Sequence, residues 1–285
     1  MKYTYRIFTI ISILAVTILI PNTDTQNTAS ASISSVGHWE CWNDDSIDPC
    51  HRALRDVSMI SATDGWAIGS DGIMLHWDGS DWSPYLSLHN QSLFGIDMLS
   101  TSDGWAVGED GLILSWNGIQ WTQVTSPITD YLWDIDMLSS SDGWAVGDWG
   151  TILHWNGIAW SVVANPAVED LTGVDMLSAN DGWAVGGDTI LHWNGSNWTQ
   201  VTSPDDTIWL EDVDMVSATD GWAVGSDYNI FRWNGTNWSV WLAAYPSNGA
   251  FYDVHMVSAT NGWAVGDFGA IMHWNGSYWD DVAGL

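Results

Sequence analysis

The chain has very little positive charge. Five lysine and arginine residues stand against 35 aspartate and glutamate residues in 285, so the formal net charge is −30. Nucleic acids and anionic lipids are bound mainly through lysine and arginine, and a surface this acidic repels both. The sequence therefore excludes nucleic-acid binding and binding to an anionic membrane surface as functions.

Glutamate is scarce as well. The chain has only Glu40, Glu109, Glu169 and Glu211, so nearly all of its acid is aspartate. Aspartate is both a turn former and a ligand for hard cations. This composition suits a protein that works in a salty or calcium-bearing exterior.

No apolar run is long enough to span a bilayer as a helix. The longest, residues 7–20, has 14 residues, whereas a spanning helix needs about 20. Lys2 and Arg6 precede this run and Ala29-Ser30-Ala31 follows it, as in a secretory signal peptide with a small-residue cleavage site. We therefore expect residues 1–31 to be removed on export to a secreted or extracytoplasmic location, leaving a net charge of 3 − 34 = −31. An uncleaved anchor is the alternative.

Cysteine is limited to Cys41 and Cys50, in the segment 32–54 between the signal peptide and the first repeat. In an oxidising compartment this pair favours a disulfide that closes a short loop and stabilises the fold by about 2 to 3 kcal/mol. Two free thiols are the alternative. The same segment holds Val36–Trp42, a candidate extra strand beside the last repeat, with a plain surface crossing as the alternative.

Tryptophan is abundant, with 24 residues, and most of it belongs to a sequence phrase that occurs six times. The phrase is D-V-D-M-x-S-x-x-D-G-W-A-V-G followed by I-L-H-W-N-G-x-x-W. Successive copies are offset by 39 residues four times and then by 41, and the G-W-A-V-G tryptophans are Trp66, Trp105, Trp144, Trp183, Trp222 and Trp263. Self-similarity at this period indicates a propeller or a solenoid.

Each copy divides into four short strands. The alternating phrase Asp134–Met137 predicts strand one, and Asp-Gly predicts a tight turn into strand two, G-W-A-V-G. The I-L-H-W phrase predicts strand three, and the second tryptophan of W-N-G-x-x-W begins strand four. Four antiparallel strands in about 39 residues make a propeller blade. The sequence therefore predicts an all-β, six-bladed β-propeller over residues 55–285, with a seven-bladed ring as the alternative.

The repeat resembles a known family. The phrase at Ser141–Gly157 is similar to the propeller repeats of the photosystem II assembly and stability factors, within the wider class of bacterial-neuraminidase-repeat, or Asp-box, propellers. The resemblance covers residues 55–282 and implies the fold. This chain departs from the family in having six repeats rather than seven, an abbreviated Asp-box, and too few arginines for an arginine-rich partner patch. The resemblance therefore does not carry photosystem assembly with it.

Enzyme activity has no positive signal in the sequence. Asp-box sialidases are expected to use three arginines from separate blades, and here Arg52 and Arg55 lie together while Arg232 occupies a repeat position. Other glycoside hydrolases need two carboxylates at a set separation, which so acidic a chain neither supports nor excludes. We expect a protein that is not an enzyme, with a carbohydrate-active hydrolase as an alternative.

Two repeat positions carry groups that are able to bind a metal. One contains His76, His154, His192 and His273, with Arg232 in blade five, and equivalent strand-three residues lie too far apart in a ring to converge on one ion. We expect these histidines to be structural. The other contains Asp97, Asp136, Asp175 and Asp214 on strand one, which is innermost in a blade. These carboxylates predict a calcium site in the channel, with hydrogen bonding to the backbone as the alternative.

Comparison among the repeats predicts which rim binds a ligand. Loops from strand one to two and from three to four share the first rim, and these are nearly invariant. Loops from strand two to three and from blade to blade share the second rim, and these vary, so specificity is expected there. The candidate binding residues on the second rim are Tyr131, Trp133, Trp149, Trp209, Tyr228, Phe268, Asp110, Asp148 and Asp227. For the aromatic residues, shielding the tops of neighbouring blades is the alternative.

The sequence thus favours an exported binding or scaffold module that holds a protein or carbohydrate on its second rim, with a lectin as a further alternative to the hydrolase. Aromatic and acidic side chains together suit a protein partner, a cationic ligand or a sugar. Six N-x-S/T sequons permit glycosylation, at Asn90, Asn194, Asn197, Asn234, Asn237 and Asn275.

Overall fold

A computed structural model describes residues 53–242 and 249–282. The predicted signal peptide, the Cys41–Cys50 disulfide and the candidate strand Val36–Trp42 lie outside the described residues. Among the residues described, no helix is long and apolar enough to cross a membrane.

The described chain forms six sheets of four antiparallel strands, which confirms the predicted six-bladed propeller. Blades one to three contain β1 (Leu54–Ser61), β2 (Asp64–Gly69), β3 (Met74–Trp77), β4 (Trp82–Tyr85), β5 (Leu93–Ser100), β6 (Asp103–Gly108), β7 (Ile113–Trp116), β8 (Trp121–Val124), β9 (Leu132–Ser139), β10 (Asp142–Gly147), β11 (Thr151–Trp155) and β12 (Trp160–Val162). Blades four to six contain β13 (Gly173–Ser178), β14 (Asp181–Gly186), β15 (Thr189–Trp193), β16 (Trp198–Val201), β17 (Leu210–Ser217), β18 (Asp220–Gly225), β19 (Ile230–Trp233), β20 (Trp238–Leu242), β21 (Phe251–Ser258), β22 (Asn261–Gly266), β23 (Ile271–Trp274) and β24 (Trp279–Asp281).

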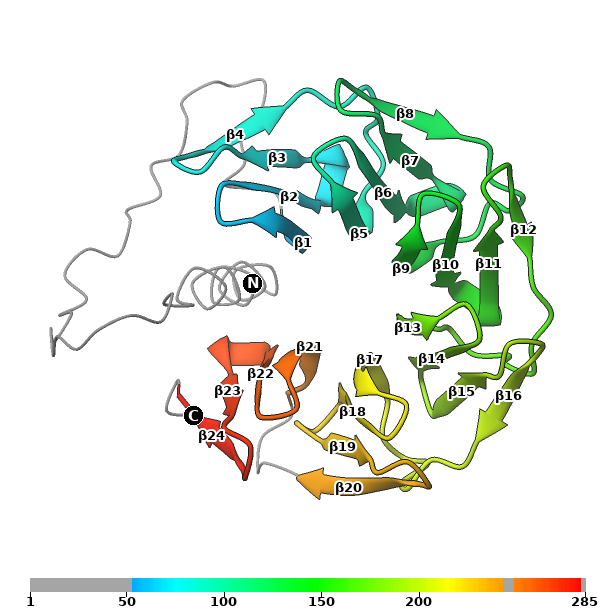
Figure 1. The fold of residues 1–285 in the computed structure, drawn as a ribbon, viewed down its shortest axis with the longest axis vertical. Coiled ribbons are helices and arrows are strands. Elements are labelled where there is room, and N and C mark those ends of the chain that lie inside the picture. Colours follow the sequence, from blue (N-terminus) through cyan, green and yellow to red (C-terminus); the bar gives the residue numbers. More distant parts are fainter. Residues whose placement is uncertain (1–52, 243–248, 283–285) are drawn as a thin grey trace, which may run out of the picture.

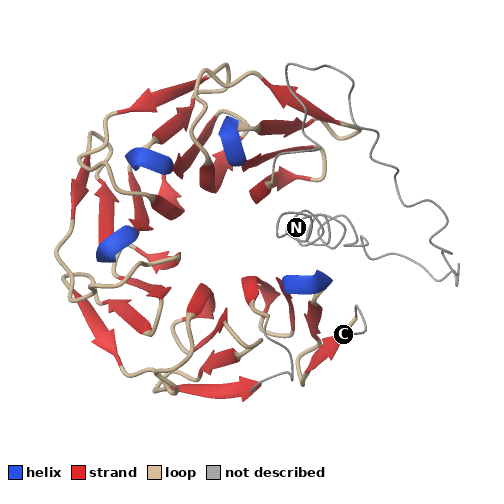
Figure 2. Ribbon diagram, turned by 180° about the vertical axis from the view of Figure 1, so that it is seen from behind, coloured by secondary structure: helices blue, strands red, loops and turns tan. Residues whose placement is uncertain are grey.

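The blades stand around a central channel. Figure 1 shows the first strand of every blade nearest the centre and the fourth at the outside. Short 3-10 turns join strands two and three in four blades: η2 (Ser70–Gly72), η3 (Glu109–Gly111), η4 (Asp148–Gly150) and η5 (Asp267–Gly269). Both views show consecutive blades side by side except at an opening between blade six and blade one (Figure 2).

The repeated residues have local roles that explain why they repeat. In the W-N-G-x-x-W hairpin of blade three, the Asn156 side-chain oxygen accepts hydrogen bonds from the N–H groups of Ile158 and Ala159, each at 3.0 Å. Gly157 follows with φ +85°, which glycine adopts without strain. Gly143, before the Trp144 of strand two, has no room for a Cβ because the Met137 sulfur lies over it.

Consecutive blades meet at contacts that we call seams, and tryptophan dominates them. At the seam between blades three and four, Trp144 lies 4.8 Å from Trp193 and 5.5 Å, edge to face, from Trp198. The same arrangement joins Trp66, Trp105, Trp183 and Trp222 to the tryptophan pair of the following blade. Each of these five strand-two tryptophans is buried, so most of the core lies between blades.

The repeated histidines support the tryptophans, as expected for structural residues. His154 Nε2 lies 2.8 Å from Asp142 Oδ1, and its ring lies 4.4 Å from the Trp144 ring. In blade five, Arg232 occupies this position, bonds Asp220 at 3.0 Å and stacks its guanidinium over Trp222 at 5.0 Å. The prediction that this repeat position is structural is confirmed.

Replacing a seam tryptophan should be costly. Trp144→Ala removes a buried indole that packs on two neighbours, so we expect the free energy of unfolding to fall by about 3 to 5 kcal/mol in urea denaturation. Trp209→Ala, in which the lost side chain is 65% exposed, is the control and should change it by no more than about 0.5 kcal/mol. Equal losses in the two variants would contradict the role given to the seams.

Candidate functional site

A cavity of about 640 Å³ opens at the mouth of the channel on the second rim. Its lining comes from the first strands of the blades and from the loops that lead into them, including Phe94 of β5, Trp133 of β9 and Glu211 of β17. No single blade forms it. The variable loops and the innermost strands therefore meet at one site, which we call the channel-mouth cavity.

One side of the cavity is aromatic. Phe94 and Trp133 stack with ring centroids 4.5 Å apart, and Tyr131 lies 5.9 Å from each of them. The Trp133 indole N–H donates to Asp148 Oδ1 at 2.6 Å, which fixes the ring. These three residues form the aromatic wall.

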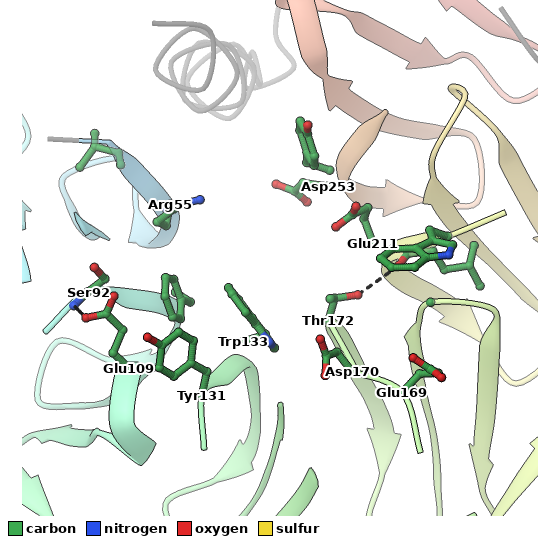
Figure 3. A pocket seen from close by; sticks show the side chains of 16 residues that line it. Arg55, Ser92, Glu109, Tyr131, Trp133, Glu169, Asp170, Thr172, Glu211 and Asp253 are labelled. Atoms are coloured by element: carbon green, nitrogen blue, oxygen red, sulfur yellow. Dashed lines mark hydrogen bonds between the residues drawn. The ribbon is translucent and has the colours of Figure 1, made fainter. Parts of the chain in front are cut away.

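The opposite side is acidic. Figure 3 shows Tyr131 and Trp133 facing Thr172 and Asp170 across the cavity, with Glu169 and Glu211 nearby. We call Glu169, Asp170 and Glu211 the acidic wall. Asp170 is held in place because its Oδ1 accepts the backbone N–H of Trp149 at 2.8 Å. A cation between the two walls would meet ring faces on one side and carboxylates on the other.

The cavity also contains one cation of the chain itself. The Arg55 guanidinium lies 5.7 Å from the centre of the Phe94 ring, within range of a cation–π contact. Its Nε is buried and has no hydrogen-bond partner among the described residues. The aromatic wall therefore already accepts a guanidinium group at its edge.

The structure separates the predicted binding residues into groups. Tyr131, Trp133 and Trp209 line the cavity, and Asp148 supports it through Trp133. Trp149, Phe268, Asp110 and Asp227 are exposed on the two-to-three turns of the second rim but do not line it.

The expectation that Tyr228 lies exposed on the rim is wrong. Its side chain is completely buried, packs on Phe251 at 5.1 Å and donates its hydroxyl to the Asp267 carbonyl at 3.1 Å. The turn of blade five is as long as that of blade six, but Tyr228 stands at the third turn position, where blades one, two, three and six have glycine. At this position its ring enters the seam with blade six.

Sequence reasoning missed the carboxylates of the site. Glu109, Glu169 and Glu211, which are all the glutamates among the described residues, line the cavity. Glu109 accepts the Ser92 N–H at 2.9 Å. The rarity of glutamate was the available signal, because all three glutamates of the described residues line this cavity, while the other acidic residues described are aspartates.

Two exposed aromatic residues on this rim have an unfavourable backbone. Trp149 is 73% exposed and has φ +57°, and Phe268 has φ +58°. Blades one and two place Asp71 and Asp110 at the same turn position with φ +53° and +56°. The left-handed region costs a bulky residue more than aspartate or asparagine. The indole of Trp149 is therefore not explained by the stability of the fold.

The four strand-one aspartates proposed as calcium ligands bridge the blades. Each accepts, through Oδ2, the backbone N–H of the methionine in strand one of the next blade, at distances from 2.6 to 2.8 Å. The donors to Asp97, Asp136, Asp175 and Asp214 are Met137, Met176, Met215 and Met256. No cluster of three or more potential metal ligands occurs in the described part of the chain. Calcium binding stays a prediction.

A second layer of strand-one aspartates bridges alternate seams. Asp56, Asp134 and Asp212 accept N–H groups of Ile96, Val174 and Val254 at 2.7 to 2.9 Å. Glycine occupies the equivalent position in blades two and four, as Gly95 and Gly173, and Asp253 occupies it in blade six. The channel is therefore lined by two layers of carboxyl groups.

The buried carboxyl groups of both layers include several with raised pKa values. Burial raises the pKa of Asp56 and of Asp175 from 3.8 to about 7. Burial, together with repulsion from neighbouring aspartates, raises the pKa of Asp134, Asp136 and Asp212 well above the ordinary value of 3.8. Part of the channel is therefore uncharged at neutral pH.

Comparison with solved structures shows that the chain has the propeller fold. It is similar to YCF48 from Cyanidioschyzon merolae, with TM-score 0.65 and 16% identity over 80% of this chain and 81% of that one. It is also similar to the WD40 propeller domain of Doa1, with TM-score 0.66 and 13% identity over 82% and 83%, and to the WD40 repeats of RRP9, with TM-score 0.61 and 13% identity over 74% and 72%. At these identities the likeness concerns the fold alone.

No family model and no curated protein matches the chain. The likeness to YCF48, a photosystem II assembly factor, agrees with the resemblance seen in the repeat at the level of the propeller. The narrower Asp-box assignment stays a prediction.

Raising the pH should destabilise the ring. The folded-state pKa of the channel aspartates lies above the unfolded value of 3.8, so their protons stabilise the fold fully below that pH, and this contribution is lost as pH rises through about 7. We expect thermal unfolding to move to lower temperature between pH 5 and pH 8. Asp136→Asn keeps an acceptor for the Met176 N–H and should flatten this dependence, whereas the exposed Asp110→Asn should leave it unchanged. A melting temperature that rises over this range would contradict the assignment.

Proposed function

We propose that this protein is an exported binding module that takes a lysine or arginine side chain of a protein partner into the channel-mouth cavity. One observation carries the proposal: the aromatic wall of Phe94, Tyr131 and Trp133 faces the acidic wall of Glu169, Asp170 and Glu211 across one cavity. Aromatic faces attract cations, and carboxylates neutralise them.

The charge of the site favours a cationic ligand. Among the described residues, the lining has five carboxyl groups and one basic side chain, Arg55. The carboxyl groups belong to Glu109, Glu169, Asp170, Glu211 and Asp253. Arg55 also shows that the aromatic wall tolerates a guanidinium, since this group lies against Phe94. A long, flexible cationic side chain has the reach to enter a cavity of this size while the partner's backbone stays on the rim.

The alternatives from the sequence fit the site less well. A lectin with repeated sugar sites needs equivalent pockets in the blades, whereas the channel-mouth cavity draws different residues from several blades. A glycoside hydrolase needs an acid of raised pKa beside its substrate. Burial raises the pKa of Asp253, but this carboxyl hydrogen-bonds to Asp212. A protein partner also agrees with the exposed aromatic residues on the same rim.

Short cationic peptides test the proposal. Tetralysine and tetra-arginine peptides should bind the mature protein, with affinity that falls as salt rises, whereas tetralysine acetylated on every amine should not bind. Trp133→Ala leaves the net charge unchanged and should weaken binding about tenfold, as should Glu169→Gln. Isothermal titration calorimetry measures both.

Asp110→Asn is the matched control, because it removes a carboxylate from the same rim outside the cavity. If Asp110→Asn weakens binding as much as Glu169→Gln, the attraction is general to the acidic surface and the site assignment is wrong. Binding of neutral oligosaccharides that competes at Trp133, without any peptide binding, would favour the lectin instead.

Trp149 allows fold and function to be separated. Trp149→Asn puts a residue that tolerates the left-handed region into the turn, so we expect the free energy of unfolding to rise by about 1 kcal/mol. If the indole contacts the partner, peptide affinity should fall at the same time, by about three- to tenfold. Phe268→Asn makes the same change in η5 and should stabilise the fold without loss of affinity. A gain in stability with unchanged affinity in Trp149→Asn would remove Trp149 from the binding surface.

A further inference from the structure

Five of the six possible seams are built in the same way, and the sixth differs. At the five seams a strand-two tryptophan lies between 4.7 and 5.6 Å from both tryptophans of the next blade. Trp263 of blade six has one ring contact among the described residues, with His273 of its own blade at 4.3 Å. The Trp77 and Trp82 pair of blade one has ring contacts only within itself in that part of the chain, at 5.6 Å.

Burial confirms that two blade faces lack the usual cover. Trp263 and Ile271 of blade six are half-buried, whereas their counterparts in the other five blades are buried. In blade one, Leu54, Val57 and Trp82 are half-buried where every other blade has a buried residue. Two apolar faces therefore border the opening in the ring seen in Figures 1 and 2.

The interblade hydrogen bonds also differ at the sixth seam. At every other seam a strand-one side chain accepts the N–H of the following methionine, from Ser58 with Met98 to Asp214 with Met256. The equivalent residue of blade six is His255, whose Nδ1 lies 3.2 Å from Asp214. Within the described residues the Met59 N–H receives no acceptor from blade six.

Residues 36–42 of the chain contain a histidine and two tryptophans, the residue types that cover the equivalent faces at the other seams. Strand three of blade three reads Ile152-Leu153-His154-Trp155, and Val36-Gly37-His38-Trp39 repeats its histidine and tryptophan. A second tryptophan, Trp42, follows after two residues, the length of a tight hairpin turn. Residues 36–42 thus contain a tryptophan pair, three positions apart, where each blade has a pair five positions apart that ends strand three and begins strand four.

The position of the segment is also suitable. The described chain begins at Ala53, immediately before β1 of blade one, which borders the opening. The ten residues 43–52 reach about 33 Å when extended. This length lets residues 36–42 lie against either blade bordering the opening.

We propose that residues 36–42 dock in the opening between blade six and blade one, where Trp39 and Trp42 supply the missing tryptophan pair for Trp263. The segment acts as the strand-three and strand-four half of a seventh blade. It covers the apolar face of blade six that includes Trp263 and Ile271. The ring is thereby closed by the part of the chain that precedes it.

Hydrogen exchange on the full mature chain tests this proposal. The double variant Trp39→Ala/Trp42→Ala should speed exchange of residues 261–266 and 271–274 at least about tenfold, while blades two to four keep their protection. The reciprocal variant Trp263→Ala should speed exchange within residues 36–42. Trp209→Ala, an exposed tryptophan outside the seams, should change neither region.

Three results would overturn the proposal. The first is unchanged exchange in blade six when Trp39 and Trp42 are replaced. The second is loss of blade-six protection in Trp77→Ala/Trp82→Ala but not in Trp39→Ala/Trp42→Ala, which would mean that blade six closes directly on blade one. The third is blade-six protection that disappears on dilution together with a dimer in light scattering, which would assign the face to a second copy of the chain.

Discussion

The packing of one tryptophan against the tryptophan pair of the next blade is the contact on which this ring depends. Within a blade, four short strands make a sheet that is too small to bury its own apolar faces. Burial is achieved only when Trp144 meets Trp193 and Trp198, and when the four equivalent contacts form. The interblade aspartates then fix the register, because each carboxylate accepts an N–H of the neighbouring first strand. The loops of the first rim hold the strands in this arrangement, and their sequences are therefore nearly the same in every blade.

The second rim contributes less to the seams, although Tyr228 packs in one of them, and its residues differ from blade to blade. The consequence is a site assembled from side chains that have no counterpart elsewhere in the ring. Phe94 and Trp133 come from first strands of adjacent blades, and Glu169 comes from a loop before the next. Repetition thus supplies the scaffold, and departures from repetition supply the chemistry.

Most of the fold could be predicted from the sequence, because its determinants are local. Asn156 and Gly157 specify a hairpin through contacts within four residues. The prediction that Asp-Gly forms the other turn is wrong: Asp142 pairs with Ser139 and begins β10, and the turn is Ser140-Ser141, where Ser139 Oγ accepts the Ser141 N–H. From the sequence, the binding site could be assigned to the second rim but not to a set of residues. The lining of the cavity joins residues that lie up to about two hundred positions apart, such as Arg55 and Asp253. Tyr228 shows a further limit: it stands at a turn position where four other blades have glycine, and its ring is buried although the pattern placed it outside. The channel aspartates show a third limit. The alternating pattern placed Asp136 near the channel, but it did not reveal that Asp136 accepts a hydrogen bond from the Met176 N–H of the next blade.

The alternation of aspartate and glycine in the channel shows that the blades are not six equal units. Asp56, Asp134 and Asp212 are separated by 134 − 56 = 78 and 212 − 134 = 78 residues, and Gly95 and Gly173 by the same 173 − 95 = 78. The heptapeptide W-T-Q-V-T-S-P occurs in blade two at Trp121–Pro127 and in blade four at Trp198–Pro204. Between blades one and two, three and four, and five and six, two strand-one side chains accept a backbone N–H across the seam, whereas one does so at each of the two seams between these pairs. The first five blades therefore repeat in twos as well as singly, and blade six departs from this longer period because Asp253 stands where blades two and four have glycine.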